Sequence, residues 1–311
     1  MYPSLIEIMN ALGNKTELYS LIKKYRLELK HEGLKEKQAP LKLLLNSLYG
    51  LLNNKYSNVN RPYLAYTLCI RGMISIYTLA KRLDSIGCEI VQINTDGVAF
   101  CGGDEEAINK VWAEWEKEFM MNLELEEYSH WYQKDVNSYI AVEKNGKIKA
   151  KGDVKKYSGD SFFQNNSTRI IDIAVVEYFV NGTDPIETLY KNLNKPYLFQ
   201  YILKVGRTYE GTFDQNGTKY NKINRIFASK DSDLKLQKWK KNGDSYSKQD
   251  FPNAPKKMWL WNGDCDDIKD FKDHVDLQHY YDLIVYKIKM WKTKSQKGNS
   301  KVADKYDYVV K

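Results

Sequence analysis

Apolar residues recur at helical spacing in the first part of the chain. Capping-box spacing from Asn14 to Glu17 predicts a helix that ends near Gly33. Its apolar residues form one predicted buried face: Leu18, Leu21, Ile22, Tyr25 and Leu29. A second helix is predicted over residues 38–53, and the short link between the two helices makes them antiparallel neighbours.

The second helix carries a narrow polar stripe. At 100° per residue, Lys42, Asn46 and Tyr49 face the same way. The opposite side is filled by leucines: Leu41, Leu44, Leu45, Leu48 and Leu52. An amphipathic helix with a solvated polar face is the ordinary explanation of such a pattern, so the stripe by itself does not indicate a site.

A third helical period runs from Asn60 to Gly87, and two apolar strands follow it. The apolar positions of this helix continue the period of 3.6 residues: Ala65, Leu68, Met73, Ile76, Tyr77, Ala80 and Leu83. Residues 88–100 alternate as two strands around an Asp-Gly turn, which predicts a hairpin with Asp96 at its tip. Another amphipathic helix is predicted after the hairpin, with Trp115 on its buried face.

The second half of the chain has weaker patterns. A hairpin is predicted for 136–151, a helix for 166–181, another helix after Asp184-Pro185, and a strand for 197–205. The remainder is poorly periodic. From Ile284 to Lys311, eight lysines face two aspartates, interleaved with Tyr286, Trp291, Tyr306 and Tyr308. This stretch could follow a nucleic-acid backbone and stack on bases, or it could be a solvated, partly disordered tail.

Composition agrees with a soluble enzyme part. The 311 residues suffice for about two or three structural units, and 42% hydrophobic residues can form a core. The net charge of +8 suits contact with phosphates but does not identify nucleic-acid binding. Four scattered cysteines indicate reduced thiols in the cytosol: Cys69, Cys88, Cys101 and Cys265. No signal peptide and no apolar run long enough to span a bilayer are evident, so we expect no membrane association.

Three stretches, in this order, resemble motifs A, B and C of the family B DNA polymerases. They are Tyr2-Pro3-Ser4, the helix segment Lys42-Leu43-Leu44-Leu45-Asn46-Ser47-Leu48-Tyr49-Gly50, and Asn94-Thr95-Asp96-Gly97. The resemblance implies an α+β fold: a polymerase palm of antiparallel sheet and helices, with a two-helix fingers insertion and a mixed thumb. It implies a palm at 1–13 and 54–154, fingers at 14–53, and a thumb with a basic carboxy-terminal tail at 155–311.

The resemblance also implies a chemistry. In this family a primer 3′-hydroxyl attacks the α-phosphate of a deoxynucleoside triphosphate, and two Mg²⁺ ions assist. Asp96 matches a catalytic, metal-binding aspartate, whereas Asn94 replaces the other aspartate of motif C. The implied nucleotide-binding residues are Lys42, Asn46, Tyr49, Tyr2, Arg26 and Lys30, with Tyr2 as the steric gate against ribonucleotides.

Contacts to primer-template DNA are implied further along the chain. Tyr139 resembles the tyrosine of the family's K-x-Y motif, although Asn137 stands where its lysine would be and Lys134 is a possible substitute. Lys149, Lys151 and Gly152 resemble the K-G strand behind that motif. An ordinary exposed edge strand kept soluble by charge would have the same lysines.

The motif A aspartate would precede residue 1, so we expect this chain to be catalytically incomplete alone. The resemblance implies an amino-terminal polymerase part or chain as a partner, supplied by a split gene or by sequence upstream of Met1. By analogy it also implies a phage or other viral source and a host-cytoplasmic location. Two alternatives stay open: a non-catalytic palm that binds primer-template DNA, and another palm-fold nucleotidyltransferase such as a reverse transcriptase.

Overall fold

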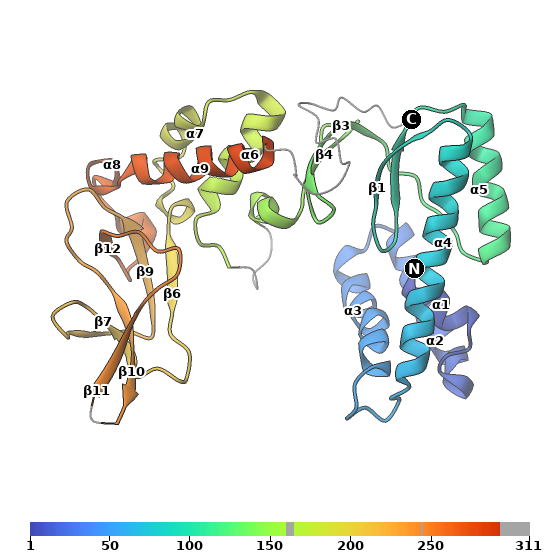
Figure 1. Cartoon of the computed structure of the whole chain (residues 1–311), viewed down its shortest axis with the longest axis horizontal. Helices are drawn as coiled ribbons and strands as arrows, with labels where there is room; N and C mark the ends of the chain where they lie inside the picture. Colours follow the sequence, from blue (N-terminus) through green and yellow to red (C-terminus); the bar gives the residue numbers. More distant parts are fainter. Residues whose placement is uncertain (160–164, 244, 293–311) are drawn as a thin grey trace. The chain divides into compact units, whose positions relative to one another are not determined.

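The computed structural model describes residues 1–159, 165–243 and 245–292, and it divides into two compact units. Their described parts are 1–127 and 128–292, called here the first and the second unit (Figure 1). Helices and antiparallel sheets occur together, which confirms the α+β expectation at that level. Along the chain, the first unit ends at residue 127 and the second begins at residue 128. The sequence placed the boundary between palm and thumb after residue 154, and this domain assignment stays a prediction.

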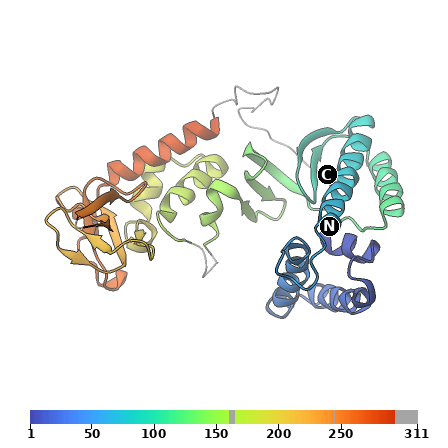
Figure 2. The same cartoon turned by 60° about the horizontal axis from the view of Figure 1, so that its bottom comes forward.

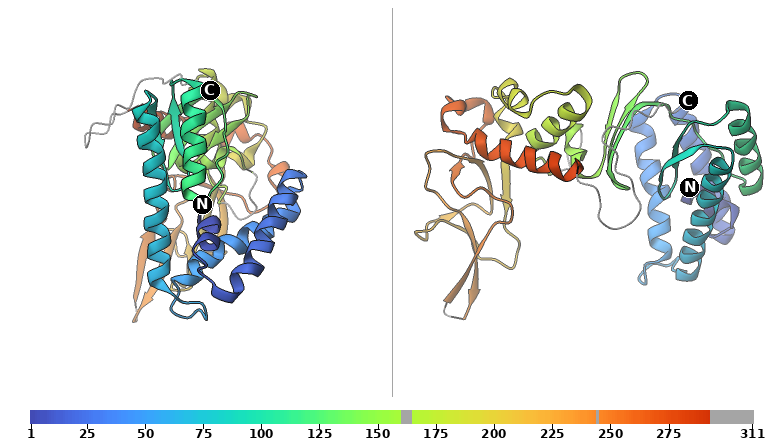
Figure 3. Two further views of the ribbon diagram at one scale, coloured as in Figure 1. Left: turned by 90° about the vertical axis from the view of Figure 1, so that its right-hand side faces the viewer. Right: turned by 45° about the horizontal axis from the view of Figure 1, so that its top comes forward.

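The first unit is mostly helical, with one hairpin. Its elements are α1 (Tyr2–Ile8), a 3-10 turn (Gly13–Lys15), α2 (Thr16–His31), α3 (Lys35–Leu52), α4 (Pro62–Ser85), β1 (Glu89–Ile93), β2 (Val98–Cys101) and α5 (Glu105–Phe119). Figure 3 shows α4 and α5 side by side. Trp115 of α5 is buried and donates its indole N–H to the carbonyl of Ser75 on α4, at 2.7 Å. The predicted helices and hairpin are therefore confirmed.

Helices α2 and α3 are antiparallel, as expected. The Tyr19 hydroxyl donates to the Leu45 carbonyl at 3.2 Å, and Arg26 Nε donates to Gln38 Oε1 at 3.3 Å. Residue numbers therefore increase along α2 in the direction in which they decrease along α3. The predicted buried face of α2 is wrong in part, because Leu18, Leu21 and Tyr25 are more than half exposed. Tyr19 and Leu29 are buried instead, since a helix that packs against few neighbours buries a narrower stripe than its apolar pattern offers.

Helix α4 is apolar on two opposite sides. Its core side is buried at Ala65, Leu68, Gly72, Ser75, Ile76, Leu79, Ala80 and Leu83. Six large residues are 56% to 70% exposed: Tyr63, Tyr66, Ile70, Met73, Ile74 and Tyr77. At 100° per residue these six, called here the outer stripe, lie within an arc of about 100° opposite the core side. Met73 and Tyr77, which continue the apolar period in the sequence, therefore lie outside the core.

The apolar character of α4 also changes one expectation from sequence. Among the described residues, one helix, α4, is long and apolar enough to cross a membrane by length and composition alone. In its most apolar stretch of 18 residues, 39% is buried inside the protein. The statement that no apolar run reaches that length is therefore wrong for this segment. Its buried side packs in the core of the first unit, as a core helix of a soluble protein also would.

The second unit contains three antiparallel sheets and a helical layer (Figure 2). Its elements are β3 (Tyr128–Asp135), β4 (Ser138–Glu143), β5 (Ile148–Ala150), a 3-10 helix η2 (Gly152–Tyr157), α6 (Arg169–Asn181), α7 (Pro185–Lys191), η3 (Pro196–Leu198), β6 (Tyr201–Lys204), β7 (Gly211–Phe213), β8 (Lys219–Tyr220), β9 (Ile223–Ala228), β10 (Gln237–Asn242), β11 (Ser245–Asp250), β12 (Met258–Leu260), η4 (Cys265–Asp267), α8 (Phe271–His274) and α9 (Leu277–Lys292). The strand orders are β3-β4-β5, β12-β9-β6 and β11-β10-β7-β8.

Predictions for the second unit succeed where local signals are strong. The 136–151 hairpin is β4 and β5, and Asp184 caps α7 by accepting the Ile186 N–H at 2.9 Å. The carboxy-terminal stretch is corrected: its first part belongs to α9, where Trp291 is 4% exposed and packs in the core instead of offering a ring to bases. Tyr306 and Tyr308 lie outside the described residues.

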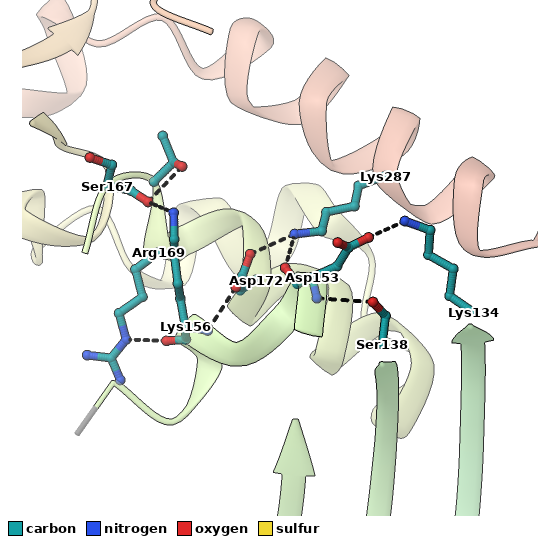
Figure 4. A network of polar contacts seen from close by, with 9 residues as sticks. Lys134, Ser138, Asp153, Lys156, Ser167, Arg169, Asp172 and Lys287 are labelled. Carbon is teal, nitrogen blue, oxygen red and sulfur yellow. Dashed lines mark hydrogen bonds and ion pairs between the residues drawn. The ribbon is translucent and has the colours of Figure 1, made fainter. Parts of the chain in front are cut away.

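A polar network joins α9 to the rest of its unit (Figure 4). Asp172 on α6 is 3% exposed; its carboxylate accepts from Lys287 Nζ at 2.8 Å and from the Lys156 backbone N–H at 2.9 Å. Lys287 also donates to the Asp153 carbonyl at 2.5 Å, and Asp153 pairs with Lys134. Burial lowers the pKa of the Lys156 ammonium. The network therefore fixes η2, which follows β5 and contacts the start of β4 at Ser138.

Candidate functional site

The β1–β2 hairpin carries Asp96 at its tip. The Asn94 N–H donates to the Gly97 carbonyl at 3.0 Å, and the Asn94 side-chain oxygen accepts from the Asp96 N–H at 3.1 Å, which closes the turn. Asp96 is exposed, and its carboxylate makes no hydrogen bond or ion pair with another residue that the structure describes. The carboxylate is thus open to a cation or to solvent, while the side chain of Asn94 already has a structural role.

Tyr2 and Tyr49 meet although they are distant in sequence. Their rings stack with centroids 4.3 Å apart and planes at 10°. Both hydroxyls approach Cys69 Sγ on α4, at 3.7 Å for Tyr2 and 2.7 Å for Tyr49. Burial, followed by the contact with Cys69, raises the pKa of the Tyr2 phenol to about 12; the hydrogen bond to Cys69 is the main cause of the raised pKa of Tyr49. Both phenols are therefore neutral at ordinary pH.

Sequence reasoning missed Cys69, which no motif marks. It lies on α4 close to Gly72, where α1 packs against α4. A Cβ on Gly72 would lie 2.8 Å from Met1 Sδ, the end of a flexible side chain, so the glycine leaves room for the Met1 side chain.

A small cavity connects the tyrosine pair with the hairpin. Its volume is about 230 Å³, and its walls include Tyr2, Cys69, Met73, Tyr77, Asn94 and Thr95. Ligand pockets usually measure roughly 300–1,000 Å³, so this cavity could hold part of a nucleotide at most. Met73 and Tyr77 belong both to the cavity and to the outer stripe of α4, so the stripe reaches the site.

Charged groups of both signs gather around Met1. Burial lowers the pKa of its α-amine; the Asp96 carboxylate opposes this effect, whereas Lys23 and Arg26 add to it. The charges of Asp96 and Arg26 thus both affect the pKa of the Met1 α-amine, in opposite directions. Lys23 pairs with Glu7 at 2.5 Å.

The remaining predicted nucleotide ligands are less well placed. Lys30 pairs with Glu124 at 2.5 Å, so it would have to leave that partner to hold a phosphate. Lys42 and Asn46 are exposed on α3 and bond to no other residue that the structure describes. The structure brings Tyr2, Tyr49 and Asp96 together, and it leaves the role of the polar stripe of α3 a prediction.

The predicted DNA-contact residues lie in the second unit. Tyr139 stacks on Trp131, with ring centroids 4.6 Å apart, and Lys149 pairs with Glu143 at 3.1 Å. Lys151 is exposed, and its backbone N–H donates to the Tyr139 carbonyl. Gly152 has φ +63°, and a Cβ there would lie 2.3 Å from the Asn137 carbonyl oxygen. Backbone packing alone therefore requires this glycine, whether or not DNA binds.

Two further aspartates near turns, Asp104 in the first unit and Asp135 in the second, have local structural roles. Asp104 caps α5 by accepting the Ala107 N–H at 2.9 Å, and Asp135 accepts from the backbone of the β3–β4 turn. Within residues 1–159, 165–243 and 245–292, no group of three or more His, Cys, Asp or Glu residues could hold a metal ion. One carboxylate does not fit the two Mg²⁺ ions expected from sequence.

Comparison with known proteins adds one finding about the fold. No protein-family model and no curated protein sequence matches the chain. Among solved structures, the family B DNA polymerase from the hyperthermophilic archaeon Pyrobaculum calidifontis is similar, with a TM-score of 0.50 and 12% sequence identity. The match covers 92% of this chain and 38% of that chain, so it spans well under half of the archaeal polymerase. At this identity the similarity concerns the fold alone.

Proposed function

We propose that this chain is part of a family B DNA polymerase that adds deoxynucleotides to a primer 3′-end. The observation that carries the proposal is the convergence of three motifs from distant parts of the sequence. Tyr2 stacks on Tyr49, and one cavity is lined both by Tyr2 and by Asn94 and Thr95, which precede Asp96 in the hairpin turn. The similarity in fold to a polymerase of this family supports the same conclusion. In this proposal, α2 and α3 are the fingers, and most of the remaining first unit is the palm.

The chain's own residues would bind and orient the nucleotide. Tyr2 would lie under the sugar and exclude a 2′-hydroxyl, and Tyr49 would hold its ring in place. Arg26 and Lys42 would neutralise phosphate charge through charge-assisted hydrogen bonds. Asp96 would supply one hard oxygen ligand for Mg²⁺, the ion that activates the hydroxyl and stabilises the leaving group in such reactions.

Since the described residues hold too few carboxylates for two ions, a second polypeptide segment would have to contribute one. The outer stripe of α4 supports this part of the proposal. A helix that is apolar on both sides is normally covered on both, and the stripe ends at the cavity beside Asn94. A segment packed on the stripe could therefore bring its own carboxylate close to Asp96.

A non-catalytic protein that binds primer-template DNA is the second candidate. The single hairpin carboxylate favours it, because a binding protein needs no metal pair. It would have the same fold and the same net positive charge as the enzyme, so only activity separates the two.

Primer extension with Mg²⁺ tests the proposal. The chain alone should bind primer-template DNA without extending it, and addition of a family B amino-terminal part that carries the motif A aspartate should start extension. Asp96→Asn should abolish the restored activity, because it keeps the side-chain volume and removes the charge. Asp84→Asn, at an exposed aspartate on α4, is the matched control and should stay active. Full activity of Asp96→Asn would refute the catalytic role, and no extension in any combination would favour the non-catalytic candidate.

A further inference from the structure

One face of the β11-β10-β7-β8 sheet collects aromatic and basic side chains. Residues paired directly across antiparallel strands point to the same side of a sheet. The register pairs Trp239 with Lys248, Lys241 with Tyr246, and Phe213 with Lys219. Phe213 pairs with Gln237, and Gln237 lies two residues before Trp239 on β10. Residues two apart on a strand point to the same side, so Phe213 and Trp239 lie on the same side of the sheet. We call these six side chains, Phe213, Lys219, Trp239, Lys241, Tyr246 and Lys248, the aromatic face.

The three rings form a continuous row across the strands. Phe213 and Trp239 stack with centroids 4.5 Å apart and planes at 17°. Tyr246 follows at 5.7 Å from Trp239 and is 47% exposed. The Lys248 ammonium lies 4.4 Å from the centre of the Trp239 ring. The row thus ends in an exposed ring, with Lys241 directly across from it on β10.

Burial in the core does not account for this row. The core of the second unit includes Leu236 and Phe251, next to these strands, but none of the three rings. Thr212, on the opposite side of the sheet, is fully buried. Cross-strand pairing of aromatics would stabilise a hairpin by itself. Such pairing does not require Tyr246 to be exposed with Lys241 directly opposite it. All six residues of β11, the strand that carries Tyr246, are exposed.

The charge of the aromatic face is positive. It holds three lysines, and the nearest acid on the same side, Asp250, already accepts from Gln237 at 2.7 Å and pairs with Lys235. Lys240, on the other side of the same strand, is exposed as well. An anionic ligand with flat apolar groups complements both properties. Figure 3 shows β10 and β11 extending away from the helices of their unit, where a long ligand has access.

We propose that the aromatic face binds single-stranded nucleic acid, with a base stacked on Tyr246 and phosphates held by Lys241 and Lys248. Aromatic rings stack on bases of any sequence, whereas the bases of a duplex are already stacked on one another. The Lys248 side chain is long enough to leave the Trp239 ring for a phosphate, and this exposes the ring to a second base. The inference concerns residues outside the polymerase site and requires neither nucleotide nor metal.

Fluorescence anisotropy of the full chain with labelled oligo(dT) tests the proposal, in EDTA and without nucleotides. Tyr246→Ala should weaken binding about tenfold, the effect of losing one stacked base, whereas Tyr246→Phe keeps the ring and should bind normally. Tyr190→Ala, at a 54% exposed tyrosine on α7, is the matched control. The pair Lys241→Gln and Lys248→Gln should reduce the salt dependence by about 1.4 in log–log slope, for two phosphate contacts.

Crosslinking identifies the contact directly. An oligonucleotide with 5-iodouracil should attach to the peptide that contains Tyr246 or Trp239, and oligo(U) in a parallel arm tells whether RNA is accepted. The proposal is overturned if Tyr246→Ala binds oligo(dT) as tightly as the unaltered chain, or if the crosslink maps elsewhere. An equal loss of duplex binding in Tyr246→Ala would also overturn it. Failure of primer extension would leave the outcome of these binding measurements unaffected.

Discussion

Replacing Asp172 by asparagine tests how much the buried ion pair stabilises the second unit. The substitution keeps an oxygen for the Lys156 N–H but leaves the Lys287 charge without its partner. Breaking a fully buried pair costs about 3–5 kcal/mol. The Lys287 side chain is 21% exposed, so water screens part of the loss and we expect about 2–3 kcal/mol. For a unit of this size, that lowers the melting temperature by about 4–12 °C.

Calorimetry of the full chain measures the effect, and hydrogen exchange of peptides from α9 and α6 assigns it to this contact. Asp233→Asn is the matched control, because Asp233 is 91% exposed and its pair with Lys257 spans 3.6 Å. It should change stability by less than about 0.5 kcal/mol. The double variant Asp172→Asn/Lys287→Met should lose less free energy of unfolding than the sum of the losses in the two single variants. A melting temperature of Asp172→Asn equal to that of the unaltered chain would refute the reasoning.

Four further outcomes are expected. In the rebuilt polymerase, Tyr2→Val should admit ribonucleotides, measured as the ratio of kcat/KM for the two sugars; unchanged discrimination would exclude a steric gate. Lys42→Ala should mainly raise KM for the nucleotide, since a phosphate contact is lost, and normal kinetics would mean that the stripe is only structural. Gly152→Ala should destabilise the second unit by more than about 1 kcal/mol in urea unfolding, because φ is +63° and the Asn137 carbonyl blocks the new carbon. Cys69→Ala should lower the pKa of Tyr49 toward 10 in an alkaline ultraviolet titration, with less effect on Tyr2, where burial is the larger cause.

The raised pKa of Tyr2 also fixes a direction for stability at high pH. The folded state keeps this proton up to about pH 12, whereas an unfolded tyrosine loses it near pH 10. The contribution of Tyr2 is therefore complete below pH 10 and is lost as the pH rises from 10 to 12. The Tyr2→Phe variant should lose less stability over this interval in unfolding measurements, and an identical pH dependence would contradict the assignment.

Local signals in the sequence were sufficient for most elements of the first unit. The helical periods and the Asp-Gly turn depend on neighbouring residues, so they predicted α2, α3, α4, α5 and the β1–β2 hairpin. The capping box predicted from Asn14 to Glu17 is wrong, because the N-cap of α2 is Lys15 and no side chain caps it. The order of the three motifs also came from the sequence alone. These features could be found without a fold because each lies within one element.

The tertiary structure decided which faces are covered and which distant residues meet. The apolar period of α4 included Met73 and Tyr77, but only packing determined that these two side chains stay exposed while Leu79 is buried. Likewise, Trp291 resembled a base-stacking residue until α9 placed it in the core. Six short strands between residues 211 and 260 had no readable pattern, because strands of two to six residues depend on partners far along the chain.

The candidate site divides in the same way. The sequence by itself provided Tyr2, Tyr49 and Asp96, since each stands in a recognisable motif. Their convergence, and the thiol of Cys69 beside the two hydroxyls, required α1 to pack on α4. The aromatic face arose from strand register, which places side chains from four strands on one side of a sheet and cannot be read from any one strand. The residues of each motif can be identified from a short segment of sequence. Contacts between distant segments depend on how the whole chain packs to exclude water from its core.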